Sequence, residues 1–417
     1  MATARVLLPA ALRLLGSATA RYGRVLSQPG ALAFVLPAAA ARLGVAMTGL
    51  GLLFSTQHAT GSFAVAGGAT GAFAIAEAAA GPQVARLVDR WGQTATVPAA
   101  VLVHVAAIVT AVTTAGSAPV AVTLAAVIGA GAAMPQPGAL SAARWSVLIP
   151  EARTLRAAFS VEAGINDVVF LSGPILVTLA STLLLPWAGS AAAAAFVAVG
   201  CGALALQRQT APAPRGARGH RERSVSHSLR APGFLATLGV NLGLGCFFGA
   251  VPLLVTAAAS AEGLRSLTGL VLALSSAASI VAGLVYGTLR SAPRPQMVQL
   301  IATIVLTVAV LAAVVWPTML GLAVMLVIGG TAVAPLLASS SQIVQATVTG
   351  TELTQGFTWI NSASAAGIAL GAALTGTLVA HDGTRAAAAL LVVLVLTAVA
   401  SAALAAQPRR TVGGCRR

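Results

Sequence analysis

The sequence predicts an all-α membrane protein, and three observations support this class. The chain of 417 residues is 58% hydrophobic and only 8% charged, with a mean hydropathy of +0.92. A soluble domain is about 25% charged, so this chain cannot cover itself with a water-compatible surface. Its apolar residues form runs of about 20, the length of a membrane-spanning helix, and nearly all its arginines lie between those runs. The composition therefore excludes an ordinary soluble enzyme, a disordered chain and a disulfide scaffold.

Twelve apolar runs are predicted to be transmembrane helices, six in each half of the chain. They cover residues 30–54, 62–83, 95–115, 119–141, 157–184, 188–206, 233–257, 266–288, 296–315, 318–340, 357–379 and 386–406. The polar stretch between the halves contains six arginines and no helical pattern, which predicts a flexible cytoplasmic linker. The expected units are a basic cytoplasmic N-terminal segment, an N-terminal six-helix bundle, the linker, a C-terminal six-helix bundle and a basic cytoplasmic tail: residues 1–28, 29–206, 207–231, 232–406 and 407–417.

The arginines predict the orientation in the membrane. All 24 basic residues are arginines, and 21 of them lie on the same side of the predicted helices as the N-terminus. Only Arg265 and Arg385 lie on the other side, and Arg42 lies inside a predicted helix. This positive-inside pattern indicates a multi-pass plasma-membrane protein with both termini in the cytoplasm. It also explains the net charge of +15 without a nucleic-acid partner. A cleaved signal peptide is an alternative for the N-terminus, but Pro9 and Arg13 interrupt its apolar core.

The two halves look like a duplication. Shared landmarks occur in the same order at an offset that drifts only from 203 to 198 residues: Pro29 and Pro232, Leu87 and Leu289, Pro135 and Pro335, Phe159 and Phe357. Six helices is an even number, so both halves enter the membrane in the same direction. This predicts two parallel six-helix repeats, a layout used by transporters. Pro135 and Pro335 are expected to kink the fourth helix of each half.

The loop after the second predicted helix carries a family signature. Residues 85–94 read Ala-Arg-Leu-Val-Asp-Arg-Trp-Gly-Gln-Thr. Through Leu87, Asp89, Arg90 and Gly92 this loop resembles the signature of the major facilitator superfamily, although Ala85, Gln93 and Thr94 depart from it; the wider resemblance covers about residues 20 to 406. It implies two bundles around a central cavity and secondary transport by alternating access. It also implies a gate in which Asp89 meets the start of the helix predicted at 357–379.

Other segments are similar to parts of the same superfamily. Gly129 to Ala133 resembles the end of a pattern in the fourth helix, with Ala125 in place of an arginine associated with proton coupling. Gly173 and Pro174 resemble an antiporter signature and are expected to shape helix packing. Segments around Arg42, Glu162–Asp167 and Thr354–Trp359 are similar to actinobacterial efflux-type members. The resemblance implies proton-coupled efflux of a small molecule. The alternatives are an importer or uniporter of a small solute, and a non-transporting sensor on the same fold.

Charged residues within the predicted helices are the main site candidates. Arg42 lies about 18 Å along its helix at 1.5 Å per residue, and a charge at that depth requires a partner or a cavity. We expect it to pair with Asp167, which lies about 15 Å along the fifth helix, with Glu77 as the alternative partner. Such a pair either couples transport to protons or locks the helices permanently. Glu162 shares a helical face with Asn166 and is expected to pair with a loop arginine.

The uncharged candidates either line the cavity or form hydrogen bonds between helices. They are Gln136, Asn241, Gln342, Trp359 and Asn361. A cavity with so few polar groups suits small amphipathic or lipophilic solutes. We find no catalytic constellation, metal-ligand spacing or phosphate-binding loop, so we expect no enzyme activity and no cofactor. The expected partners are a small-molecule substrate, protons and the lipid bilayer, and the expected state is a monomer.

Overall fold

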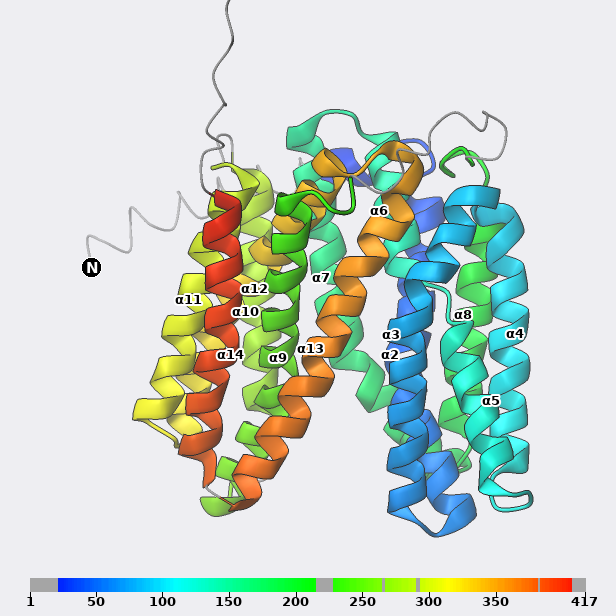
Figure 1. Cartoon of the computed structure of the whole chain (residues 1–417), viewed down its shortest axis with the longest axis vertical. Helices are drawn as coiled ribbons and strands as arrows, with labels where there is room; N and C mark the ends of the chain where they lie inside the picture. The colour runs from blue at the N-terminus through cyan, green and yellow to red at the C-terminus, as the bar shows by residue number, and fades with distance from the viewer. Residues whose placement is uncertain (1–21, 215–227, 265–266, 290–292, 382, 407–417) are drawn as a thin grey trace, which may run out of the picture.

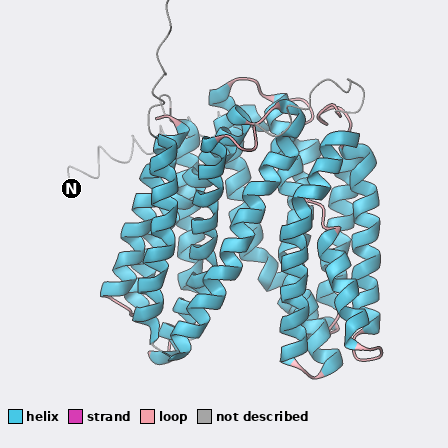
Figure 2. Ribbon diagram, viewed as in Figure 1, coloured by secondary structure: helices cyan, strands magenta, loops and turns pink. Residues whose placement is uncertain are grey.

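The computed structural model is built of long helices (Figures 1 and 2), and it describes residues 22–214, 228–264, 267–289, 293–381 and 383–406. The helices are α2 (Ala31–Thr60), α3 (Phe63–Trp91), α4 (Gln93–Thr114), α5 (Val120–Ala132), α6 (Pro137–Leu148), α7 (Ala152–Leu179), α8 (Ala188–Leu206), α9 (Pro232–Ala261), α10 (Thr268–Thr288), α11 (Pro295–Val315), α12 (Met319–Thr347), α13 (Leu353–His381) and α14 (Gly383–Ala406). A π-helical turn at Ala180–Leu184 extends α7, and a 3₁₀ turn at Gly350–Glu352 precedes α13. Most of the predicted N-terminal segment, the centre of the linker and the tail lie outside the described residues.

The all-α membrane fold is confirmed. In the described chain, 11 helical segments are long and apolar enough to cross a membrane, with α5 and α6 together forming one of them. The helix α3, which carries Glu77, Arg86 and Asp89, occupies the place of the remaining predicted helix. Several helices extend beyond the predicted ends, because hydrogen-bonded backbone continues after the apolar run stops. Thus α3 reaches Trp91 and α7 begins at Ala152.

The fourth predicted helix is broken, where the sequence predicted only a kink. Between α5 and α6, residues 133–136 are not helical. Pro135 and Pro137 flank Gln136, whose backbone has φ −102° and ψ 75°. The proline after Gln136 disfavours a helical conformation there, and Pro137 itself opens α6 in the position that proline prefers. The new helix therefore begins inside the apolar segment.

Small residues bring pairs of helices into close contact within each bundle. Gly44 of α2 lies against the backbone of α8, and Gly245 of α9 lies against the backbone of α13. Gly367 and Gly371 of α13 also lie against α9, because a Cβ at either position would overlap the α9 backbone. Gly67 of α3 makes no such contact, since a Cβ there would meet nothing within 4 Å.

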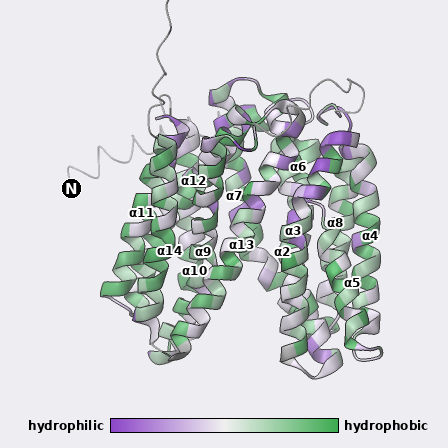
Figure 3. Ribbon diagram, viewed as in Figure 1, coloured by the Kyte–Doolittle hydropathy of each residue, from purple (hydrophilic) through white to green (hydrophobic). Residues whose placement is uncertain are grey.

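The two bundles meet at one end and separate toward the other (Figure 1). We call the end where α3 finishes and α13 begins the Asp89 end; hydrophilic segments gather there in Figure 3. Near it, a Cβ on Gly81 of α3 would lie 3.4 Å from Thr358 of α13. Gly67 lies about four turns away on the same face of α3 and faces open space. The helices α3 and α13 therefore diverge away from the Asp89 end.

Candidate functional site

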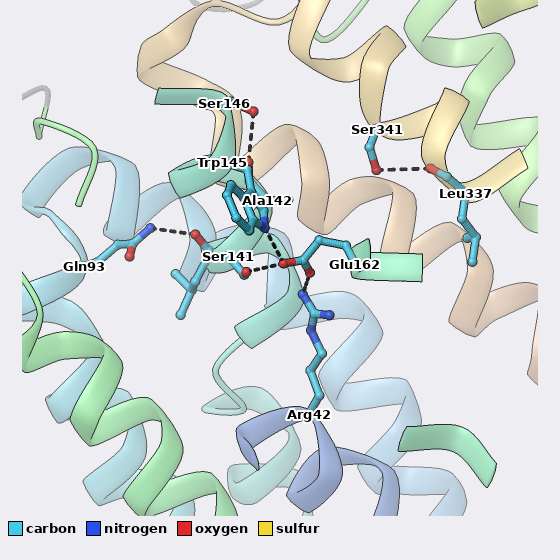
Figure 4. Close-up of polar contacts among 10 residues, drawn as sticks. Arg42, Gln93, Ser141, Ala142, Trp145, Ser146, Glu162, Leu337 and Ser341 are labelled. Atoms are coloured by element: carbon cyan, nitrogen blue, oxygen red, sulfur yellow. Dashed lines mark hydrogen bonds and ion pairs between the residues drawn. The ribbon is translucent and has the colours of Figure 1, made fainter. Parts of the chain in front are cut away.

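Four polar side chains form a buried cluster in the N-terminal bundle, drawn in Figure 4. Arg42 of α2 forms an ion pair with Glu162 of α7 through its Nη2 atom. The other carboxylate oxygen of Glu162 accepts hydrogen bonds from Ser141 Oγ at 2.6 Å and from Trp145 Nε1 at 2.7 Å. We call these residues the Arg42 cluster. It joins α2, α6 and α7, and both oxygens of its carboxylate are satisfied.

The predicted partners of Arg42 and Glu162 are therefore wrong. Arg42 pairs with Glu162 rather than with Asp167 or Glu77, and Glu162 pairs with this intramembrane arginine rather than with a loop arginine. Arg42 is the twelfth residue of α2 and Glu162 the eleventh of α7. Since α7 begins five residues earlier than predicted, Glu162 lies deeper in the bundle than the sequence suggested.

The spacing of residues in α6 explains how the cluster is assembled. Gly138, Ser141 and Trp145 follow the i, i+3, i+7 pattern and share one face of the helix. The Trp145 ring is fully buried and meets the Phe34 ring edge-on, with 4.8 Å between centroids. This packing fixes the direction of the indole N–H. On α7, Asn166 lies one turn after Glu162 on the same face and is partly exposed.

The α5–α6 break positions two further predicted residues. Gln136 donates from Nε2 to Glu77 Oε1 on α3 at 3.3 Å. Two residues later, an ideal Cβ on Gly138 would lie 3.4 Å from Arg42 Nε and 3.6 Å from Asn361 Nδ2 on α13. The break thus places the start of α6 between the Arg42 cluster and the C-terminal bundle.

Asp167 faces the C-terminal bundle instead of Arg42. It is buried on α7, and the hydroxyl of Ser279 on α10 is its polar neighbour. No hydrogen bond of ordinary geometry joins them, and both Asp167 Oδ2 and Ser279 Oγ are buried without a partner among the described residues. An unsatisfied carboxylate oxygen is costly to bury. This residue is therefore a candidate for a group that binds and releases a proton.

Asp89 makes the contact that the family resemblance implies. Its two carboxylate oxygens accept hydrogen bonds from the backbone N–H groups of Thr354, at 3.2 Å, and Gln355, at 2.8 Å. These are the free N–H groups at the start of α13, where a negative charge is favourable. Three residues after Asp89, Gly92 has φ +89°, a conformation that other residues avoid, and makes the turn from α3 into α4 possible. The guanidinium of Arg90 lies over the neighbouring Trp91 ring.

Further contacts between the bundles surround Asp89. The Phe159 and Phe357 rings, predicted as equivalent landmarks of the two halves, meet with 6.0 Å between centroids. The Arg156 guanidinium lies 5.8 Å from the centre of the Tyr286 ring on α10. Gln342 of α12 donates to the Tyr286 hydroxyl at 2.9 Å. Gln342 therefore supports the contact surface at the Asp89 end.

Other predicted residues lie away from this surface. Asn241 is buried in the C-terminal bundle and donates to Ser340 Oγ at 3.0 Å. Of the two predicted alternatives, it therefore forms a hydrogen bond between helices. Trp359 remains exposed on α13, two residues before Asn361 and therefore on a different face.

The remaining predictions for helix packing concern α7 and α12. Gly173 is buried and packs closely against Ala46 of α2, with 3.0 Å between its ideal Cβ and that residue's Cβ. Pro174 and Pro335 lie inside continuous helices. Gly173 therefore sets the close approach of α7 to α2.

Sequence reasoning missed Arg144, which it placed in a loop. The side chain is fully buried on α6 and donates to Gln93 Oε1, to the Leu204 carbonyl and to the Gln207 carbonyl, each at 2.7 Å. The last two acceptors lie at the C-terminal end of α8, where a cation is favourable. Arg144 therefore fastens the start of the linker to the N-terminal bundle. The sequence offered one indication of this burial: Arg144 lies three residues after Ser141, which is one helical turn.

Within the described residues, no group of three His, Cys, Asp or Glu side chains could hold a metal ion. Cys201 and Cys246 are buried free thiols.

Comparisons with known proteins identify the fold. No protein-family model matches the chain, and no curated protein sequence matches it. The human organic anion transporter MFSD10 (TETRAN) is similar in structure, with a TM-score of 0.66 and 17% identity over 92% of this chain and 99% of that one. A bacterial homologue of the iron transporter ferroportin, in an outward-facing state, has a TM-score of 0.70 and 13% identity, covering 89% of this chain and 98% of its own. The E. coli fucose:proton symporter FucP has a TM-score of 0.68 and 13% identity, covering 90% and 98%. At these identities the chain shares the fold of major facilitator transporters.

Proposed function

From this transporter fold, we propose that the chain is a secondary transporter that moves a small molecule by alternating access. The observation that carries the proposal is the closure at the Asp89 end. There the carboxylate of Asp89 in one bundle caps a helix of the other, while the helices α3 and α13 diverge away from it. A contact of a few hydrogen bonds can open and close as one bundle rocks against the other.

The buried Arg42 cluster lies in the N-terminal bundle beside the C-terminal bundle, where a transported solute would bind. The Arg42 cluster lies on the N-terminal bundle next to Asn361 of the C-terminal bundle. Intramembrane charges are costly and usually mark a substrate or ion pathway. A solute bound between the bundles would contact both, so its binding energy could drive one state into the other.

We further propose that transport is proton-coupled export, with Asp167 as the coupling group. Its carboxylate is buried against Ser279 across the bundle interface and is not held by an arginine. Proton binding removes the cost of burying a charge. Movement of α7 away from α10 would hydrate this carboxyl group and release the proton. The export direction rests on the resemblance to efflux-type members. The proposed orientation has the Asp89 end and both termini in the cytoplasm.

Drug and metabolite susceptibility in an efflux-deficient bacterial host tests the proposal. The host would express the native chain, Asp89→Ala, Asp167→Asn and the control Glu151→Gln, at equal membrane levels. Glu151 is an exposed acid immediately before α7 and accepts a hydrogen bond from Thr154 Oγ1 of that helix. We expect resistance to particular compounds with the native chain and the control, and its loss with both other variants. Equal resistance with Asp167→Asn would contradict coupling through that residue.

A facilitated importer or uniporter is the second candidate, because both oxygens of the Glu162 carboxylate in the Arg42 cluster are paired and this carboxylate needs no proton. Flux in proteoliposomes separates the two functions. Export predicts accumulation against the solute gradient when a proton gradient is applied, whereas a uniporter only equilibrates the solute. Saturable binding without any flux would indicate a sensor.

A further inference from the structure

We propose that Tyr22 is a second gating residue, which holds the Asp89 end closed at a different pair of helices from Asp89. This inference rests on the proposed alternating-access function, because a gate has a role only if this end opens. Asp89 joins α3 to the start of α13. Tyr22 joins the segment before α2 to α10, so the two contacts hold different helices of the C-terminal bundle.

The hydroxyl of Tyr22 crosses from one bundle to the other. Residues 22–26 are helical and lead into α2 of the N-terminal bundle. Tyr22 Oη donates to the backbone carbonyl of Leu284 at 2.8 Å and lies 3.2 Å from that of Gly283, both within α10 of the C-terminal bundle. A hydroxyl has one proton, so the two carbonyls share one donor. Tyr22 therefore forms a polar contact between the bundles that depends on a single O–H group.

A glycine leaves room for the Tyr22 ring. A Cβ on Gly287 of α10 would overlap Tyr22 Oη, and it would lie 3.0 Å from Tyr22 Cζ and 3.0 Å from Ser160 Oγ on α7. Tyr22 is only 9% exposed. The phenol therefore packs against α10 because position 287 lacks a side chain, and Ser160 brings α7 to the same point.

The helical turn that carries Tyr22 is anchored by burial. Tyr22 and Val25 are one turn apart on the same face, and both are buried, whereas Arg24 between them is exposed. Tyr22 and Val25 belong to the hydrophobic core that also contains Phe34 of α2 and Tyr286 of α10. Movement of α10 away from the N-terminal bundle must therefore break the Tyr22 hydrogen bond or pull this turn out of the core.

The Tyr22 contact lies at the pair of helices α7 and α10. On the same pair, the Arg156 guanidinium lies 5.8 Å from the centre of the Tyr286 ring. Rocking of one bundle against the other separates this pair and the pair α3 and α13 together, so the contacts of Tyr22 and Asp89 must both break. Loss of one neutral hydrogen bond changes such an equilibrium by about two- to tenfold. The two gating residues should therefore affect each other's side of the Asp89 end.

Cysteine labelling of the purified chain in nanodiscs tests the gate without requiring transport. The reporters are introduced after the native cysteines are replaced by alanine: Cys201, Cys246 and Cys415. One reporter is Ser160→Cys, beside Tyr22, and the other is Thr354→Cys, beside Asp89; both positions are buried. We expect Tyr22→Phe, which keeps the ring and loses the donor, to raise the labelling rate at both positions about two- to tenfold.

Position 354 is the readout that a purely local role of Tyr22 would not move, since Thr354 lies on α13 and Tyr22 contacts α10. Faster labelling at position 160 alone would show local loosening and would overturn the gate. Native labelling rates at both positions in Tyr22→Phe would overturn it as well.

Gly287→Ala is an independent variant, because it takes away the room for Tyr22 and leaves the hydroxyl in the chain. We expect labelling at position 354 to rise at least about twofold, and a native rate there would contradict the gate. Gly269→Ala on α10, where a Cβ meets nothing within 4 Å, is the matched control. Ser27→Ala is the control for Tyr22→Phe, because Ser27 Oγ donates to the Arg24 carbonyl of its own segment. Both controls should be labelled at native rates.

The outcomes separate this gate from the proposed function. If Tyr22→Phe is labelled faster at both positions but the native chain moves no solute in proteoliposomes, transport is overturned and the gate stands. If the native chain moves a solute and Tyr22→Phe is labelled at native rates, the gate is overturned and transport stands.

Discussion

The two halves of the molecule share one architecture but differ in where their polar chemistry lies. In the N-terminal bundle the fourth helix is broken at Pro135, and Ser141 and Trp145 beyond the break belong to the Arg42 cluster. Its counterpart α12 contains Pro335 and remains one helix from Met319 to Thr347. At the offsets between the halves, Arg42 corresponds to Leu244 and Glu162 to Ile360, both buried and apolar. Among the described residues, the buried Arg–Glu pair and the break in the fourth helix therefore belong to the N-terminal bundle.

The proline pattern explains the difference in backbone. In α12 a single proline removes one hydrogen bond, which a helix tolerates as a bend. In the N-terminal bundle two prolines surround Gln136, and the restriction on the residue before a proline adds to the lost hydrogen bonds. The first half thus has a helix start inside the membrane segment, whereas the second half supplies continuous helices that pack against it.

The largest expected effect comes from removing one charge of the buried pair. Arg42→Leu should lower the free energy of unfolding by about 3–5 kcal/mol, because Glu162 is left buried without its partner. The double variant Arg42→Leu/Glu162→Leu should recover more than half of that loss, since the pair would then resemble the apolar C-terminal counterpart. Denaturant unfolding in detergent measures both. A double variant as unstable as the sum of its two single variants would show that the charges are not coupled.

A second comparison concerns Arg144 and its counterpart Val344. Arg144→Leu should cost about 3 kcal/mol, because Gln93 and two carbonyls lose a charged donor. Val344→Ala removes only buried methyl groups and should cost about 1–2 kcal/mol. The same unfolding measurement compares them. Equal losses would mean that the Arg144 hydrogen bonds add nothing beyond packing.

A smaller effect is expected in the polar trio of the C-terminal bundle. Ser340 Oγ accepts hydrogen bonds from Asn241 Nδ2 at 3.0 Å and from Gln299 Nε2 at 2.8 Å. Ser340→Ala should lower stability by about 1–2 kcal/mol but leave the solute KM unchanged, because the trio is buried within one bundle. A changed KM would place this trio in the transport site and weaken the contrast between the halves.

The smallest change in free energy is expected at the contact between Asp89 and the start of α13, which joins the two halves. Asp89→Asn keeps the shape of the side chain but loses its charge at the start of α13, worth about 0.3–1 kcal/mol. That should open the Asp89 end severalfold more often while leaving the unfolding free energy nearly unchanged. Labelling of a cysteine introduced at Thr354 measures the opening. If the cysteine in Asp89→Asn were labelled at the same rate as in the native background, Asp89 would not act as a gate.

The sequence predicted the fold well, because twelve apolar runs and the distribution of arginines depend only on composition along the chain. It also predicted the contact of Asp89 with α13, since that follows from a local signature. It did not predict the partner of Arg42. Depth along a helix cannot show which face a side chain occupies, and Glu162 and Asp167 are five residues apart on different faces of α7.

The break before α6 and the burial of Arg144 were also missed. Each depends on backbone geometry and on acceptors contributed by distant segments. The i, i+3, i+7 pattern of Gly138, Ser141 and Trp145 was visible in the sequence. Its meaning required knowing that a helix starts at Pro137.

The central claim is that the two ends of the molecule open alternately about the Arg42 cluster. Two spin-label pairs measure this directly: Arg90 with Gly350 at the Asp89 end, and Thr60 with Ala261 at the other end, each joining α2–α3 to the C-terminal bundle. We predict that a transported solute lengthens the first distance and shortens the second together, and that Asp89→Asn shifts the populations in the same direction. Solute binding that leaves both distances unchanged would contradict alternating access.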